Sequence, residues 1–136
     1  MNTVIIDSDA LIGLIHQADA LHHRSVQAFK YLKGEDFNLF IPYPILLEAA
    51  TALSRIVGRS DLAAQILHGF SSFKDEIDTN VAEMVAKLYD PETSKKNTPF
   101  DYYVLALAKK NNIKYVFSFD SFYKKNGLIL IEDVIS

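Results

Sequence analysis

Short apolar runs alternate along the chain with longer segments in which apolar residues recur every three or four positions. The short runs are typical of buried β-strands, and the longer segments are typical of amphipathic helices. The pattern predicts strands at Thr3–Ile6, Asn38–Ile41, Tyr115–Phe117 and Leu128–Ile131, with a further short strand at Glu76–Asp78. It predicts helices at Ala10–His16, Leu21–Lys33, Pro44–Val57, Asp61–Phe73, Val81–Leu88, Pro99–Asn111 and Ser121–Lys125.

This order of elements predicts the fold class. Strands that alternate with helices form βα units, whose strands pair in parallel within one sheet that helices cover. We therefore expect a single α/β domain over residues 1–136, with a central, mostly parallel sheet flanked by helices. In open sheets of this kind, ligands bind beyond the carboxyl ends of the strands, at the point where the strand order reverses.

The composition narrows the class of protein. The chain is 49% hydrophobic and 23% charged, as in ordinary globular proteins, and it has no cysteine for disulfides, thiolate metal sites or nucleophiles. No segment approaches the ~20 apolar residues of a membrane span, and no basic segment followed by an apolar one marks a signal peptide. We therefore expect a cytoplasmic protein without membrane association. A net charge of −3 argues against a general nucleic-acid coat, although a bound divalent cation would reverse the charge of an acidic site.

Acidic residues stand directly after two of the predicted strands. Asp7 and Asp9 follow the apolar run at residues 4–6, and Asp120 follows the run at residues 115–119. Aspartate is among the best helix N-caps, and Asp-Ser-Asp can also form a polar turn. The same positions lie where a parallel sheet binds ligands, so the residues alone leave a structural and a functional interpretation open.

Two further acids lie on predicted helices. Asp101 has capping-box spacing after Thr98. At ~100° per residue, however, Asp101 falls on the apolar face of its helix, where a carboxylate is costly unless a positive group pairs with it. Glu48 lies at the margin of an apolar helical face, where it can be solvated or can pair with Arg55.

Taken together, these stretches resemble the PIN-domain ribonucleases, and especially the VapC-type toxins of toxin–antitoxin pairs. The stretches are VIIDSDALIGLI, PILLEAATAL, FDYYVLALAKKNN and VFSFDSFYKKNGL, and the resemblance extends over essentially the whole chain. It implies a PIN-like three-layer fold, with catalytic acids at Asp7, Glu48, Asp101 and Asp120 and with Ser118 and Asp9 as residues that orient them. Phe122 occupies a position at which many members carry a further acid, so the resemblance implies a four-acid site.

Four carboxylates cannot share a site as bare anions, because like charges at close range force some of them to take up protons. Oxygen ligands without cysteine or paired histidines favour Mg²⁺ or Mn²⁺ over Zn²⁺, and the resemblance implies the same metal. We therefore hypothesise a metal-dependent endoribonuclease in which Asp7, Asp101 and Asp120 bind the metal. Candidate RNA contacts are Lys95, Lys96, Lys124 and Lys125, which can equally be solvated surface lysines.

Two alternatives come from the same residues. The stretch Asp7-Ser8-Asp9 is similar to the Asp-x-Asp motif of haloacid-dehalogenase-type phosphatases, in which Asp7 would be the nucleophile. That family has Thr or Val where this chain has Leu11, and 136 residues leave little room for its later lysine. The other alternative is a non-catalytic binding module whose acids are caps and surface groups. The PIN resemblance implies an RNA substrate, a homodimer and a cognate antitoxin that inserts a segment into the active-site groove.

Overall fold

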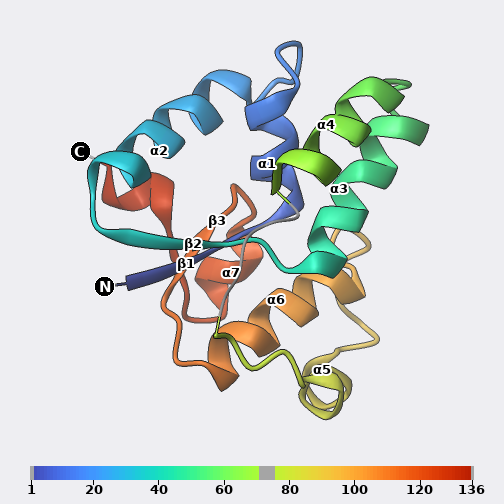
Figure 1. The fold of residues 1–136 in the computed structure, drawn as a ribbon. Coiled ribbons are helices and arrows are strands. Elements are labelled where there is room, and N and C mark those ends of the chain that lie inside the picture. Colours follow the sequence, from blue (N-terminus) through green and yellow to red (C-terminus); the bar gives the residue numbers. More distant parts are fainter. Residues whose placement is uncertain (1, 71–75, 136) are drawn as a thin grey trace.

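Four short parallel strands form the centre of the molecule (Figure 1). The computed structural model describes residues 2–70 and 76–135, and within them the strand order is β2-β1-β3-β4, with every neighbouring pair parallel. The strands are β1 (Asn2–Ile6), β2 (Phe37–Phe40), β3 (Tyr115–Phe117) and β4 (Ile129–Leu130). The predicted α/β fold with a parallel sheet is confirmed.

Helices connect and cover these strands. None of the helices in the described part of the chain is long and apolar enough to cross a lipid bilayer. The predicted helix that ended at Phe73 is described only as far as Phe70, since 71–73 lie outside the described residues. The helices are α1 (Ser8–Ile15), α2 (His22–Gly34), α3 (Tyr43–Arg55), α4 (Ser60–Phe70), α5 (Ala82–Leu88), α6 (Pro99–Lys110), α7 (Ser121–Lys125) and a final 3₁₀ helix (Ile131–Val134).

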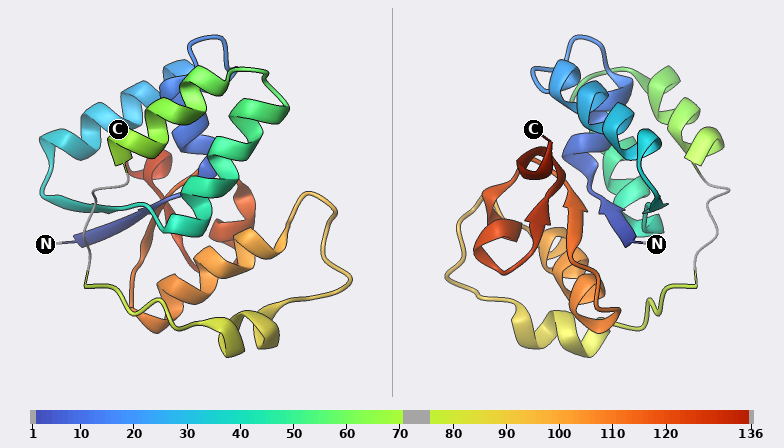
Figure 2. Two further views of the ribbon diagram at one scale, coloured as in Figure 1. Left: turned by 45° about the vertical axis from the view of Figure 1, so that its right-hand side comes forward. Right: turned by 90° about the vertical axis from the view of Figure 1, so that its left-hand side faces the viewer.

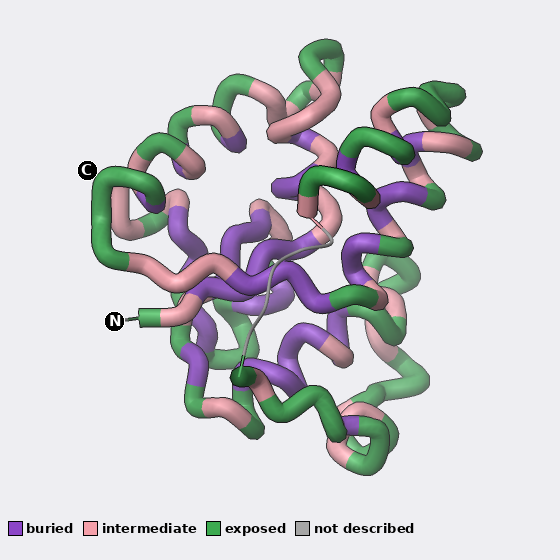
Figure 3. The backbone as a smooth tube through the Cα atoms, in the orientation of Figure 1, coloured by how far each residue is buried: buried purple, intermediate pink, exposed green. Residues whose placement is uncertain are grey.

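The alternation of side chains along β1 divides the core into two halves. Val4 and Ile6 pack with α1, α2, α3 and α4 on one face of the sheet, whereas Ile5 packs with α6 and α7 on the other. Figure 2 shows the two groups of helices on opposite sides of the strands, and Figure 3 shows the buried strands between them. The result is the three-layer arrangement predicted from the sequence.

The short strand expected at Glu76–Asp78 is wrong, because this segment is irregular. The Asp78 backbone N–H donates to Asn111 Oδ1 at 2.9 Å, and Asn111 Nδ2 donates to the Asp78 carbonyl at 3.0 Å. A side chain thus satisfies the backbone groups of Asp78 that a neighbouring strand would otherwise pair. The last strand is also shorter than expected, since the chain turns into the 3₁₀ helix at Ile131.

Helices α1 and α2 approach each other closely at Gly13. A β-carbon at this position would collide with the Ser25 hydroxyl of α2, so any larger residue would force Ser25 to shift. On the opposite side of α1, Leu11 is fully buried in the core beneath the sheet face. This packing fixes the helix that follows β1 and that carries Asp9 in its first turn.

The order of the strands places the ends of β1 and β3 side by side. β1 is followed along the chain by β2 on one side, and β3 then pairs on its other side, so the strand order reverses between β1 and β3. The Asp7 backbone N–H extends this pairing by donating to the Phe117 carbonyl at 3.0 Å. The point at which such sheets bind ligands therefore lies between Asp7 and the turn at residues 118–120.

Candidate active site

Asp7 ends β1 and is almost completely buried, with 4% of its surface exposed. It is the N-cap of α1, because its Oδ1 accepts a hydrogen bond from the Ser8 backbone N–H at 2.9 Å. Its other oxygen, Oδ2, accepts a hydrogen bond from the Tyr123 hydroxyl at 2.6 Å. The cap therefore occupies one side of the carboxylate, and the other side faces the acids described below.

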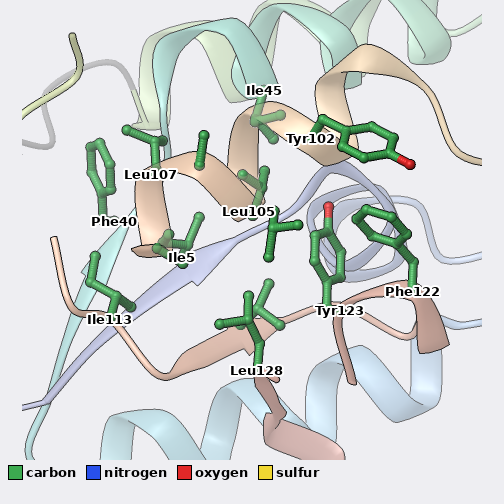
Figure 4. Close-up of a cluster of buried hydrophobic side chains, with 14 of the residues drawn as sticks. Ile5, Phe40, Ile45, Tyr102, Leu105, Leu107, Ile113, Phe122, Tyr123 and Leu128 are labelled. Carbon is green, nitrogen blue, oxygen red and sulfur yellow. The ribbon is translucent and has the colours of Figure 1, made fainter. Parts of the chain in front are cut away.

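Asp101, at the start of α6, also lies close to the Tyr123 hydroxyl. At the start of α6, Asp101 Oδ2 accepts from the Thr98 backbone N–H at 2.9 Å, and Asp101 Oδ1 lies 3.3 Å from the Tyr123 hydroxyl. Figure 4 shows the side chain of Tyr123 beside that of Phe122, with Tyr102 of α6 close to both. Burial, followed by the charges of Asp7 and Asp101, raises the pKa of Tyr123 far above its usual range, so this residue stays a protonated donor.

Asp9 ties α1 to the turn that follows β3. Asp9 Oδ2 accepts from Ser118 Oγ at 3.0 Å and from the Phe119 backbone N–H at 2.8 Å. Ser118 Oγ accepts in turn from the Asp120 backbone N–H at 3.1 Å. Asp120 is the N-cap of α7, since its Oδ1 accepts from the Phe122 backbone N–H at 2.9 Å.

Glu48 approaches the group from α3. It is half-buried, and its Oε1 is shielded from solvent yet accepts no hydrogen bond within the described part of the chain. Burial raises the pKa of Glu48, an interaction with the Ser8 side chain lowers it, and the charges of Asp101 and Asp9 raise it further. No ion pair joins Glu48 to Arg55 in residues 2–70 and 76–135, so the pairing that the sequence allowed is not formed.

The carboxylates are close enough to perturb one another. Burial raises the pKa of Asp7 well above its ordinary value, and the charges of Asp9 and Asp101 add to the rise. Burial likewise raises the pKa of Asp9 and of Asp101, and for both the charge of Asp120 contributes in the same direction. None of the ion pairs between described residues involves these acids. The site thus holds an uncompensated negative charge that a cation would relieve.

The donors fit a hard divalent cation. All are carboxylate or hydroxyl oxygens, the chain has no cysteine, and the buried Glu48 Oε1 has no partner in the described structure. Within the described ranges, no three acidic or histidine side chains already stand as a set of ligands to one ion. Mg²⁺ normally keeps several water molecules, so a coordination sphere completed by water suits this arrangement better than a closed cage of side chains.

We expect the metal-free protein to lose stability as the pH rises. Asp7, Asp9, Glu48 and Asp101 have raised pKa values, so the folded protein binds their protons more tightly than the unfolded chain does. Their contribution to stability is present at low pH and is lost as the pH rises from about 4, the ordinary carboxyl pKa, through the raised values. In EDTA the melting temperature should therefore fall by several degrees between pH 5 and pH 8, at about 4 °C per kcal/mol. A melting temperature that rises over this interval would contradict the prediction.

The structure brings together all the acids that the sequence singled out. Asp7, Asp9, Glu48, Asp101 and Asp120 interact with one another, and Ser118 hydrogen-bonds within the same network. The candidate RNA contacts lie on the surface. Lys124 forms an ion pair with Asp133 at 3.0 Å, whereas Lys95, Lys96 and Lys125 are exposed.

Sequence reasoning missed two residues at this site. Tyr123 lies three residues after Asp120 in the stretch VFSFDSFYKKNGL, and nothing in the local pattern indicates that its hydroxyl contacts Asp7 and Asp101. The Arg24 guanidinium of α2 lies 4.7 Å from the centroid of the Phe119 ring and pairs with Glu132. Hydrogen bonding to Glu132, and less strongly the charge of Asp9, raises the pKa of Arg24. These contacts join residues so far apart in the chain that spacing gives no signal of them.

Comparisons with known proteins agree with this architecture. A model of the PIN domain matches residues 4–127. Among solved structures, the chain is similar to the crystal structure of Mycobacterium tuberculosis VapC20, described as a sarcin-ricin loop cleaving toxin, with a TM-score of 0.77. The two share 16% sequence identity, and the match covers 93% of this chain and 96% of that one. No curated protein matches the chain significantly.

Proposed function

The chain belongs to the PIN-domain family, and on this premise we propose that it is a metal-dependent ribonuclease of the VapC type, the toxin of a toxin–antitoxin pair. The observation that carries the proposal is the convergence of acids from β1, α1, α3, α6 and the β3–α7 turn on one partly buried site. The VapC20 toxin, which shares the fold, is described as a sarcin-ricin loop cleaving toxin. RNA phosphodiesters are accordingly the substrate that we assign.

Each residue of the site has a distinct role in this proposal. Asp7, Asp101 and Asp120 would hold Mg²⁺ or Mn²⁺, directly or through water. When bound, the cation acts as a Lewis acid toward the phosphate and lowers the pKa of water. Glu48 Oε1 would take a proton from the attacking water and orient that water toward phosphorus. The water oxygen would form the new P–O bond as the bond to the leaving ribose oxygen breaks, and the proton would then pass to that ribose oxygen.

The test is cleavage of a labelled RNA by the purified protein with Mn²⁺, with Mg²⁺ and with EDTA. We expect cleavage with either metal and none with EDTA, because the clustered acids need a cation to bind an anionic phosphate. An Asp7→Asn preparation controls for contaminating nucleases. Cleavage by the wild type that continues unchanged in EDTA would overturn the proposed dependence on metal.

The phosphatase alternative is disfavoured by the surroundings of Asp7. A nucleophilic aspartate needs a free oxygen that a phosphate can reach. Here Asp7 is 4% exposed, and each of its oxygens already accepts a hydrogen bond, from Ser8 or from Tyr123. Hydrolysis of a small phosphomonoester without cleavage of RNA would nevertheless favour the phosphatase. A non-catalytic binding module would show neither activity, and calorimetry would detect no Mn²⁺ binding that depends on Asp7.

The exposed lysines before α6 are proposed RNA contacts. Replacing Lys95 and Lys96 with glutamate should weaken RNA binding, because phosphate contacts from lysine contribute affinity and salt dependence without sequence preference. The slope of log K against log salt should decrease by about 0.7 per lost contact. Binding can be measured by fluorescence anisotropy over a salt series, for this pair and for Lys124 with Lys125. The matched control is the double glutamate variant of the exposed residues Lys30 and Lys33 of α2. If all three double variants weaken RNA binding equally, the assignment of the four candidate lysines as RNA contacts is wrong.

An apolar groove beside the site suits the antitoxin that the family implies. Leu47 and Phe100 line it together with Glu48, and Leu47, Phe100 and the neighbouring Ile56 are all exposed. We assign this groove to a segment of the antitoxin, and we expect the toxin itself to be a homodimer. Light scattering, which measures the molar mass in solution, tests the homodimer.

The groove assignment is tested with the protein of the neighbouring reading frame as the inhibitor of RNA cleavage. The assignment fails if this protein inhibits Leu47→Glu as strongly as it inhibits the wild type.

A further inference from the structure

We propose that Tyr123 is a positioning residue of this site, whose hydroxyl sets the separation and the orientation of the Asp7 and Asp101 carboxylates before a cation binds. The inference rests on the proposed function, because it takes those two acids to be metal ligands. In this inference, the uncharged side chain of Tyr123 in α7 holds Asp7, which follows β1, close to Asp101 of α6.

The position of the hydroxyl is fixed by the packing of its ring. Tyr123 is 0% exposed and belongs to the core cluster between the sheet and α6, with Leu105 and Leu128 (Figure 4). Its ring contacts that of Phe122 in a T-shaped arrangement, with the ring centroids 5.4 Å apart. A ring enclosed in this way has no alternative rotamer without displacing the core. The hydroxyl is therefore a fixed point against which both carboxylates are set.

The geometry makes this hydroxyl the direct link between the two acids. Its oxygen lies 2.6 Å from Asp7 Oδ2 and 3.3 Å from Asp101 Oδ1, so its one proton goes chiefly to Asp7. The remaining hydrogen bonds of these acids come from the backbone N–H groups of Ser8 and Thr98, each within its own helix start. Those bonds orient each acid within its own helix start, whereas the Tyr123 hydroxyl orients the two acids relative to each other.

A neutral donor suits this task better than a positive side chain. Lysine or arginine between Asp7 and Asp101 would hold both carboxylates and would also neutralise the charge that attracts a cation. A hydroxyl donates to carboxylates without cancelling their charge, and groups that orient metal ligands typically change metal affinity 10–100-fold when they are removed. Tyr123 can therefore hold the two acids in place while leaving their negative charge available to the metal.

The substitution Tyr123→Phe tests the proposal, because it removes the hydroxyl and keeps the ring that fills the core. We expect the Kd for Mn²⁺, measured by calorimetry in the absence of RNA, to rise about 10–100-fold. The Mn²⁺ concentration that gives half-maximal RNA cleavage should rise by a similar factor. A purely structural role would lower the melting temperature of the variant and leave the Kd of the folded protein for Mn²⁺ unchanged.

Tyr102→Phe is the matched control. Tyr102 is buried in the same cluster, and its hydroxyl forms no hydrogen bond with the described residues, so the Kd for Mn²⁺ should not change. A wild-type Kd in Tyr123→Phe, while Asp7→Asn abolishes binding, would overturn the inference and leave the proposed function intact. If the wild type bound no Mn²⁺ at all, the proposed function would fall, and this inference would fall with it.

Discussion

The substitution Asp7→Asn is expected to lower RNA cleavage by on the order of 10³-fold, about 4 kcal/mol of transition-state stabilisation, while it stabilises the metal-free protein. Asparagine keeps the shape of the side chain and an oxygen for the Ser8 N–H that caps α1. It removes the negative charge that would hold the cation. Because burial raises the pKa of Asp7, the same change removes a buried charge that destabilises the fold at high pH. Activity and stability should therefore change in opposite directions.

Cleavage rates in Mn²⁺ and melting temperatures in EDTA at pH 8 measure these two effects. Asp61→Asn is the matched control, because it makes the same chemical change at an exposed acid that pairs with Arg59. We expect the control to cleave RNA at the wild-type rate. A loss of cleavage in Asp7→Asn that came with a lower melting temperature would indicate misfolding rather than a missing metal ligand. Wild-type cleavage by this variant would remove Asp7 from the site.

The sequence predicted the positions of the acids because local rules govern where strands end. A buried run followed directly by an acid located the end of β1, where Asp7 lies, whereas Asp120 lies three residues past the end of β3, at the start of α7. The structure also shows that capping and clustering do not exclude each other. Asp7 and Asp120 each use one oxygen to cap a helix, and Asp101 uses one to bond the Thr98 N–H. The second oxygens of Asp7 and Asp101 lie beside the Tyr123 hydroxyl. The structural interpretation of these residues as caps is therefore confirmed, and their catalytic role stays a prediction.

The contacts that join the acids could not be predicted, because they are tertiary. In the sequence, Tyr123 cannot be distinguished from other buried aromatic residues. Only the packing of α7 against α6 brings its hydroxyl to Asp7 and Asp101. Glu48 reads as a residue at the edge of an apolar face, a position that does not distinguish a solvated acid from a buried one. Its unpartnered Oε1 results from the approach of α3 to the start of α1. Helical periodicity indicates which face is buried, but it does not identify the partner.

A second large effect is expected at Asp9, whose carboxylate holds the turn after β3. Its Oδ2 accepts from Ser118 Oγ at 3.0 Å and from the Phe119 N–H at 2.8 Å, and Ser118 Oγ in turn accepts from the Asp120 N–H. Alanine at position 9 would leave a buried hydroxyl and a backbone amide without their acceptor, at about 1–3 kcal/mol for each unpaired group. Asp120 would then lose its fixed position, and a displacement of about 1 Å can lower the rate on the order of 100-fold.

Asparagine at the same position separates the hydrogen bonds from the charge. Asp9→Asn and Asp9→Ala both remove a carboxylate whose pKa is raised chiefly by burial, so the difference between them reports the bonds to Ser118 and Phe119. We expect Asp9→Asn to keep its cleavage rate within about tenfold of the wild type and to melt several degrees above Asp9→Ala, at about 4 °C per kcal/mol. If the two variants melt and cleave alike, Asp9 does not hold the turn. Asp120 would then be positioned by the cap of α7 alone, in which its Oδ1 accepts from the Phe122 N–H.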